Sequence, residues 1–258
     1  MLTVDPASLD VPQALSAFAR DGYAPLGRVL SDEGLRALGT RADDLMHGRA
    51  PREPLFFQRD ADSGRYEDLA FGRGWQGPSP AYRKIEKLEH DPIFHRWIAN
   101  PLFGRIAREH LAGPVALYRA VLFTKAATGG TRLPWHQDDG AFWGIDRAPG
   151  LQIWTALDDA PVDAGCLEVV PGSHRRGLAT AQGGVIPDAL AEDDLRAGRT
   201  RHLPARAGEA FLVHNHLWHR SGINTTGHRR AALSICYISA ATRCLRKRRA
   251  PRRFLPLF

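Results

Sequence analysis

Residues 115–124, VALYRAVLFT, are the first of five short apolar runs rich in β-branched and aromatic side chains. Pro114 precedes this run, and turn signals such as Gly129-Gly130 and Pro149-Gly150 follow it. Apolar runs of this length between turn residues predict buried strands. The other four runs are residues 151–157, 167–170, 209–213 and 231–239.

The first 110 residues have a different pattern and are predicted to be mainly helical. Asp10 and Ser31 are capping residues followed by apolar residues at helical spacing, and Asp91-Pro92 and Asn100-Pro101 combine a cap with a first-turn proline. Residues 48–80 lack periodicity, so we expect a long surface loop of the length of a functional lid.

Helices followed by many short strands predict an α+β protein, with an all-β core in the form of a sandwich or barrel and the helices packed outside it. The length fits one domain, residues 1–258. We divide it into a mainly helical part (1–110), a β core (115–240) and a basic tail (243–258).

The net charge of +7 is concentrated in that tail. The chain has 35 Lys and Arg against 28 Asp and Glu, and seven of the basic residues with no acid lie in residues 243–258. A nucleic-acid-binding domain should instead spread its positive charge over one folded face, so we expect no nucleic-acid partner. We expect the tail to be a solvated end; a strap over the fold or a contact with an anion are the alternatives.

The composition also bears on location and partners. There is no run of 18 apolar residues and no basic-then-apolar leader, so we expect neither a membrane span nor a secretory signal. The three cysteines form no CxxC motif, which is typical of a reducing, cytoplasmic setting. We expect a small-molecule substrate and a monomer or homodimer.

The segment 134–140, PWHQDDG, contains His136 and Asp138 two residues apart. On a strand, such residues point to the same face and can reach a single ion. The segment 214–219, HNHLWH, offers a third ligand from a distant strand. Two histidines and one carboxylate on one face are characteristic of non-haem Fe(II) oxygenases. Spacing alone does not choose among His214, His216 and His219.

Other interpretations of this pattern remain open at this point. A zinc-dependent hydrolase, or a hydrogen-bonded His–Asp pair in a turn, fits the same spacing. Arg229 and Arg230 favour an oxygenase that uses a dicarboxylic oxoacid, because a buried arginine binds a carboxylate through two parallel hydrogen bonds. The alternative is that these two arginines are exposed charges at the start of a strand.

Four segments resemble the phytanoyl-CoA dioxygenase family of Fe(II)- and 2-oxoglutarate-dependent oxygenases. They are FARDGYAPLG (18–27), PWHQDDGAFW (134–143), LQIWTALDDAPVDAGCLEVVPGSHRRG (151–177) and GEAFLVHNHLWHRSGINTTGHRRAALSICY (208–237). The resemblance implies a double-stranded β-helix, also described as a jelly roll and cupin-like. It also implies Fe(II) as the metal, 2-oxoglutarate and O₂ as cosubstrates, and a hydroxylase activity that releases succinate and CO₂.

The resemblance assigns roles to individual residues. His136, Asp138 and His219 match the iron ligands, which makes His214 and His216 neighbours of the site. Arg230 and Ser221 match the residues that hold the distal carboxylate of 2-oxoglutarate. Three further positions match cosubstrate contacts: Lys84, Trp154 and Val121, the last where many relatives have Met.

The substrate itself is less readable. Asp138 is present where halogenating relatives have a small residue, which favours hydroxylation or a related oxidation over halogenation, and we expect a small polar secondary metabolite as substrate. Candidate contacts are Gln137, Phe142 and Trp143, and, in the 48–80 segment, Phe56, Phe57, Arg59, Arg73 and Trp75. The alternatives from other classes are a zinc-dependent hydrolase and a non-catalytic small-molecule-binding module on a cupin-like fold.

Overall fold

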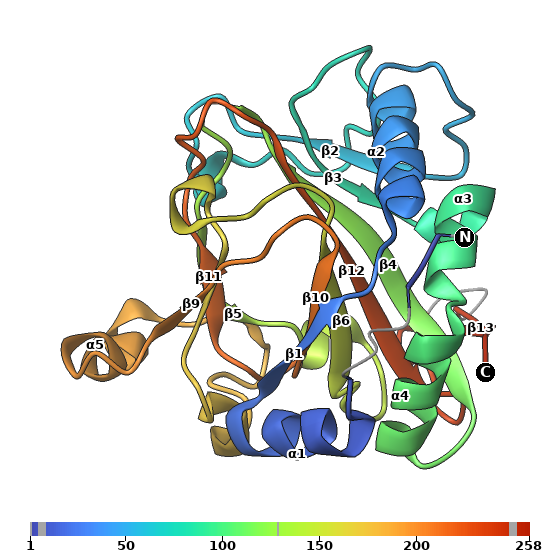
Figure 1. Ribbon diagram of the computed structural model, residues 1–258. Coiled ribbons are helices and arrows are strands. Elements are labelled where there is room, and N and C mark those ends of the chain that lie inside the picture. The colour runs from blue at the N-terminus through green and yellow to red at the C-terminus, as the bar shows by residue number, and fades with distance from the viewer. Residues whose placement is uncertain (1, 5–8, 128, 248–251) are drawn as a thin grey trace.

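The computed structural model describes residues 2–4, 9–127, 129–247 and 252–258. Within these ranges the chain forms two antiparallel sheets and helices that cover the larger sheet (Figure 1). The α+β class predicted from the order of helices and strands is confirmed. The two sheets pack face to face: Trp154 and Phe211 of the larger sheet share a buried cluster with Val169 and Leu203 of the smaller one.

The larger sheet has eight strands and the smaller one five among the described residues. The larger sheet runs in the order β1 (Tyr23–Arg28), β10 (Glu209–Val213), β6 (Leu151–Ala156), β12 (Arg230–Ser239), β4 (Val115–Lys125), β3 (Tyr82–Glu86) and β2 (Phe56–Arg59), and β13 (Leu255–Pro256) also pairs with β4. The smaller sheet runs in the order β8 (Gly184–Val185), β5 (Leu133–Gln137), β11 (His219–Ser221), β7 (Leu167–Val169) and β9 (Arg201–Leu203).

The first four helices begin at the predicted caps, whereas the fifth was not predicted and has no side-chain cap. Asp10 and Ser31 accept hydrogen bonds from the backbone N–H groups of Gln13 and Gly34, at the starts of α1 and α2. Asp91 and Asn100 do the same at α3 and α4. The helices are α1 (Val11–Asp21), α2 (Asp32–Met46), α3 (Pro92–Ile98), α4 (Pro101–Leu111) and α5 (Asp188–Arg196), and none of those described is long and apolar enough to cross a membrane.

The main core lies between helices α1–α4 and the outer face of the larger sheet. Phe18, Trp97 and Ile106 from the helices are almost completely buried there, against Leu122 and Leu233 from the sheet. This packing fixes the larger sheet from outside, so the opposite face of that sheet is available to form a site.

One expectation about the N-terminal part needs correction. Residues 1–110 hold helices α1–α4 and also contribute β1, β2 and β3 to the larger sheet. Residues 48–80, however, are not one long loop. Residues 56–59 form β2, which pairs with β3, and residues 66–68 form a 3₁₀ turn, so this segment is joined to the larger sheet.

The basic tail is a strap in its described part, and the expectation of a solvated end was wrong there. Strand β13 pairs with Leu117 and Ala116 of β4, and the Phe258 carbonyl accepts a hydrogen bond of 2.8 Å from the Val115 N–H. The Arg252 guanidinium lies over the Tyr118 ring, 4.9 Å from its centroid. Arg248 and Arg249 lie outside the described residues.

Candidate metal centre

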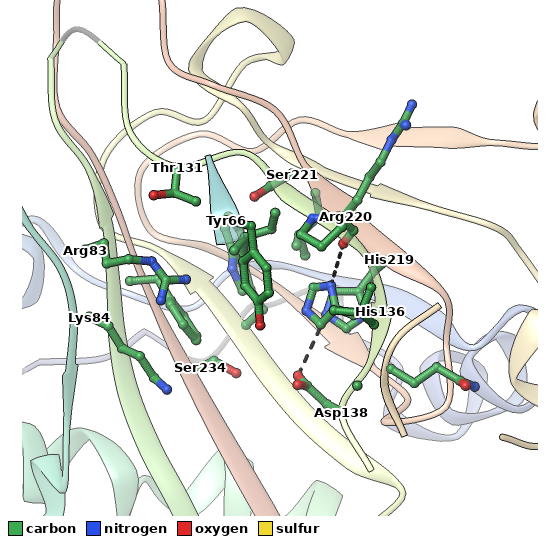
Figure 2. Close-up of a pocket in the computed structure, with 18 of the residues that line it drawn as sticks. Tyr66, Arg83, Lys84, Thr131, His136, Asp138, His219, Arg220, Ser221 and Ser234 are labelled. Atoms are coloured by element: carbon green, nitrogen blue, oxygen red, sulfur yellow. Dashed lines mark hydrogen bonds and ion pairs between the residues drawn. The ribbon is translucent and has the colours of Figure 1, made fainter. Parts of the chain in front are cut away.

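Strands β5 and β11 bring three of the predicted ligands together. They are antiparallel neighbours, with His219 directly opposite His136, and Asp138 immediately follows β5. The two imidazole centroids are 4.0 Å apart, and His219 Nε2 lies 3.7 Å from Asp138 Oδ2 (Figure 2). Potential ligand atoms of all three residues lie within 4.8 Å of one another, so they can hold one metal ion.

Backbone carbonyls fix the orientation of both imidazoles. His136 Nδ1 lies 2.9 Å from the Pro134 carbonyl oxygen, and His219 Nδ1 lies 2.9 Å from the Leu217 carbonyl oxygen. A carbonyl oxygen only accepts, so each Nδ1 carries the proton and each Nε2 keeps a lone pair for a metal. His136 and His219, on two different strands, are thus held in the same tautomer, in which Nε2 is free to bind a metal ion.

Arg119 and Gln152 hold the third ligand, and sequence analysis missed both. Arg119 Nη2 donates to Asp138 Oδ1 at 3.0 Å, and Gln152 Nε2 donates to Oδ2 at 2.9 Å. Burial by itself raises the pKa of Asp138, but Arg119 and the two histidines outweigh it and hold this pKa well below its usual range. The carboxylate is therefore ionised and fixed, as a metal ligand requires.

Arg230 and Ser221 line the same cavity as the three ligands. Arg230 is 4 % exposed; its guanidinium donates to the Gly165 carbonyl at 2.7 Å, and burial lowers its pKa to about 10. No carboxylate of the described residues lies within ion-pair distance of it. Ser221 is 3 % exposed, and its Oγ is buried without a hydrogen-bond partner among the described residues. A cation and a hydroxyl in this condition fit an external carboxylate.

The other predicted cosubstrate contacts lie on the larger sheet. Lys84 of β3 and Trp154 of β6 line the cavity, and Lys84 also forms an ion pair with Glu86. Val121 is buried on β4 but is not among the residues that line the cavity.

The predicted substrate contacts divide into two groups. Phe142 and Gln137 both line the cavity, although the Gln137 amide also donates to the carbonyls of Gly177 and His216; Trp143 stacks on Tyr118 and is not part of the lining. In the 48–80 segment, Phe57 is in the core and Trp75 packs beneath Arg52. The cavity is instead lined from this segment by Gln58, Tyr66 and Phe71.

His214 and His216 do not reach the ligand cluster. His216 Nε2 forms a 2.7 Å contact with Asp139 Oδ2, and the His214 ring packs between Phe18 and His174. Both lie in the turn between β10 and β11, and their side chains pack against neighbouring residues outside the ligand cluster.

Lys125 is a further buried cation that sequence analysis missed. It lies directly opposite Arg230 across β4 and β12, is 4 % exposed and donates from Nζ to the Thr131 carbonyl at 2.6 Å. Burial, and after it the charge of Arg230, lowers its pKa from the ordinary 10.5 to about 6.

We expect Lys125→Met to raise the free energy of unfolding by about 1–4 kcal/mol at pH 7, because it removes a buried amine that has no carboxylate partner among the described residues and therefore has to give up its proton on folding. Since the unfolded lysine binds its proton up to pH 10.5, the penalty is full below about pH 6 and disappears as the pH rises through 10.5. Urea unfolding at pH 6 and pH 9 measures this difference. Lys247→Met, at an exposed lysine, is the control. If Lys125→Met raised the free energy of unfolding equally at both pH values, the lowered pKa of Lys125 would not be the cause of the gain.

Comparison with known proteins places this geometry in a family. Residues 18–232 match the model of the family described as phytanoyl-CoA dioxygenase (PhyH). The chain is 29 % identical, over 85 % of its length and 83 % of the relative's, to L-proline trans-4-hydroxylase of Streptomyces griseoviridis. The crystal structure of EctD from S. alaskensis with 2-oxoglutarate and 5-hydroxyectoine superposes with a TM-score of 0.72 at 23 % identity, covering 96 % of this chain and 83 % of EctD.

A second solved structure supports the fold. The epimerase SnoN in complex with Fe³⁺, α-ketoglutarate and nogalamycin RO has a TM-score of 0.72 at 20 % identity, with 96 % of this chain and 95 % of SnoN covered. These likenesses confirm the double-stranded β-helix. With the family match over most of its length and the His136–Asp138–His219 cluster, the chain belongs to the phytanoyl-CoA dioxygenase family of non-haem iron, 2-oxoglutarate-dependent oxygenases.

Proposed function

We propose that the protein is an Fe(II)- and 2-oxoglutarate-dependent dioxygenase that hydroxylates a small polar secondary metabolite. His136, Asp138 and His219 hold the iron, and Arg230 with Ser221 holds the distal carboxylate of 2-oxoglutarate. Lys84 and Trp154 complete the cosubstrate site, whereas Val121, which the family resemblance also implied, does not line the cavity. The observation that carries the proposal is the unpartnered Ser221 Oγ and the carboxylate-free Arg230 in the cavity of the metal cluster.

The same observation disfavours the two alternatives. A zinc hydrolase needs the three ligands and a water, and it has no use for a buried cation and a hydroxyl placed to receive a carboxylate. A non-catalytic binding module has no need to keep both imidazoles in one tautomer and an ionised carboxylate between two donors.

When bound, iron would supply the oxidising chemistry together with 2-oxoglutarate and O₂: one oxygen atom of O₂ would go to succinate, formed with CO₂ from the oxoacid, and the other would go to the substrate. The residues of this chain orient the reactants. Arg119 and Gln152 prevent Asp138 from rotating, and Arg230 fixes the far end of the cosubstrate. Trp154, Phe123 and Leu133 provide apolar wall that excludes water from the cavity.

The size of the cavity and the named relatives support a small substrate. The cavity has a volume of about 260 Å³, which suits a small molecule beside the cosubstrate. The related hydroxylase is named for L-proline, and EctD was solved with 5-hydroxyectoine. Both are small polar molecules.

Anaerobic titration of the apoprotein with Fe(II) and then 2-oxoglutarate tests the proposal. We expect the weak visible metal-to-ligand charge-transfer band of an iron–oxoacid chelate to appear only when both are present. Zn(II) in place of Fe(II) is the control and should give no band. Failure to observe the band with Fe(II), together with O₂-independent hydrolysis supported by Zn(II), would favour the hydrolase instead.

A further inference from the structure

The wall of the cavity carries far more positive than negative charge. Among the described residues that line it, the only carboxylate is Asp138, whereas six residues are cationic: Arg83, Lys84, Arg119, Lys125, Arg220 and Arg230. Three of these cations are paired, Lys84 with Glu86, Arg119 with Asp138 and Arg220 with Glu168. Arg83, Lys125 and Arg230 have no carboxylate of the described chain within ion-pair distance.

Arg83 is held in place but is not neutralised. It is 8 % exposed, and Nη1 donates to Gln58 Oε1 at 2.7 Å. Gln58 is itself 3 % exposed and donates from Nε2 to the Ala70 carbonyl at 3.1 Å, so both ends of its amide are engaged. Asp60 is the acid that acts most strongly on Arg83, but its Oδ1 accepts from the backbone and side chain of Thr131.

The cosubstrate leaves this charge unbalanced, an argument that rests on the function proposed above. Asp138 is already paired with Arg119, so the two carboxylates of 2-oxoglutarate offset only two of the three positive charges that Fe(II) and Arg230 bring. Lys125 can lose its proton, but a guanidinium cannot. Arg83 therefore remains a buried cation whose one side-chain hydrogen-bond partner in the described part of the chain is a neutral amide, which is costly unless a further anion is bound.

We infer that Arg83, oriented by Gln58, binds an acidic group of the primary substrate, so that the enzyme acts on a small carboxylic acid, amino acids included. Figure 2 shows Arg83 entering the cavity from the side opposite His136, Asp138 and His219. The acid group is anchored at that end, and the carbon that is oxidised lies at the other end of the molecule, next to the metal.

A panel of small acids, each paired with its primary amide, tests this inference. The probes are L-proline, hexanoate and benzoate and their amides, added anaerobically to the wild-type complex with Fe(II) and 2-oxoglutarate while the charge-transfer band is followed. We expect at least one acid to perturb the band with a Kd at least tenfold below that of its amide. Binding of no acid, or equal binding of acids and amides, overturns the inference.

Substitutions of Arg83 distinguish a role in binding the substrate from a role in binding 2-oxoglutarate. Arg83→Gln should weaken binding of that acid at least tenfold and abolish its preference over the amide, and Arg83→Lys should restore part of it. Arg132→Gln removes the same charge from an exposed position beside the cavity but outside its lining, and should retain the preference.

The remaining outcomes are also decisive. If Arg83→Gln raises the Kd of 2-oxoglutarate as much as that of the acid, Arg83 belongs to the cosubstrate site and the inference fails. The charge-transfer band of each variant shows whether its site has folded. Absence of the band in the wild type would instead mean that the proposed function has failed.

Discussion

Asp138→Ala is expected to reduce the affinity for Fe(II) by more than about 100-fold and to abolish succinate formation. Loss of a residue that only orients a metal ligand already lowers metal affinity by about 10–100-fold. Asp138 is itself a ligand residue and the anionic member of the cluster. The substitution also leaves Arg119, whose Nη2 donates to Asp138 at 3.0 Å, as an unpaired cation beside the metal position. Repulsion between Arg119 and the metal then adds to the loss of the bond.

Fe(II) titration of the apoprotein under anaerobic conditions measures this effect separately from catalysis. Asp139→Asn is the matched control, because it removes the neighbouring carboxylate, which contacts His216 at 2.7 Å and does not line the cavity. That control should retain iron binding within about threefold. Wild-type affinity in Asp138→Ala would exclude Asp138 as a ligand, and a near-native circular dichroism spectrum would exclude unfolding as the reason for any loss.

Local signals were sufficient to predict helices α1–α4 and five of the core strands, β4, β6, β7, β10 and β12, but not helix α5. Asp10, Ser31, Asp91 and Asn100 each cap a helix in the structure, because capping depends on residues within a few positions of one another. The apolar run at 209–213 coincides with β10. The spacing of His136 and Asp138 also indicated a shared face, since that relation is local to one strand.

The choice among three histidines needed more than spacing. His214, His216 and His219 lie within six residues, and only the register of β11 against β5 places His219 opposite His136. Register is decided by pairing between distant segments, which a single sequence does not display. The family resemblance supplied the answer that spacing had left open.

Arg119, Lys125 and Arg83 escaped detection for a related reason. Each lies in or beside an apolar strand, and each becomes important through a partner on another strand: Asp138, Arg230 and Gln58, respectively. The sequence did show a charged residue within an otherwise apolar, buried strand. Such a residue needs a partner in the protein interior, but the sequence does not say which residue that partner is.

The tail was misjudged because its charge was weighed more heavily than its apolar end. Phe258 lies so close to α4 that a β-carbon on Gly104 would approach its ring to 2.7 Å. Leu255 and Pro256 add a short strand beside β4. Arg252 places its guanidinium over Tyr118, so a residue counted as a solvated charge packs against the fold.

Arg230→Gln is expected to raise the Kd of 2-oxoglutarate by about 100-fold, because truncating one partner of a buried, hydrogen-bonded charge pair costs about 2–5 kcal/mol. Glutamine keeps a donor but loses the charge and the planar fork that match a carboxylate. Affinity for Fe(II) alone should be unchanged within about twofold, since Arg230 is not one of the three ligand residues. Arg230→Lys should recover part of the cosubstrate affinity.

Arg229→Gln is the matched control for this prediction. Arg229 is adjacent in sequence, but its guanidinium forms ion pairs with Asp158 at 2.8 Å and with Asp43, away from the cavity. Loss of Arg229 should lower stability and leave the Kd of 2-oxoglutarate unchanged. The intensity of the charge-transfer band against 2-oxoglutarate concentration gives Kd for both variants. Equal values in Arg230→Gln and wild type would transfer the role to Lys125, which is the other cation at that end of the cavity and lies directly opposite Arg230.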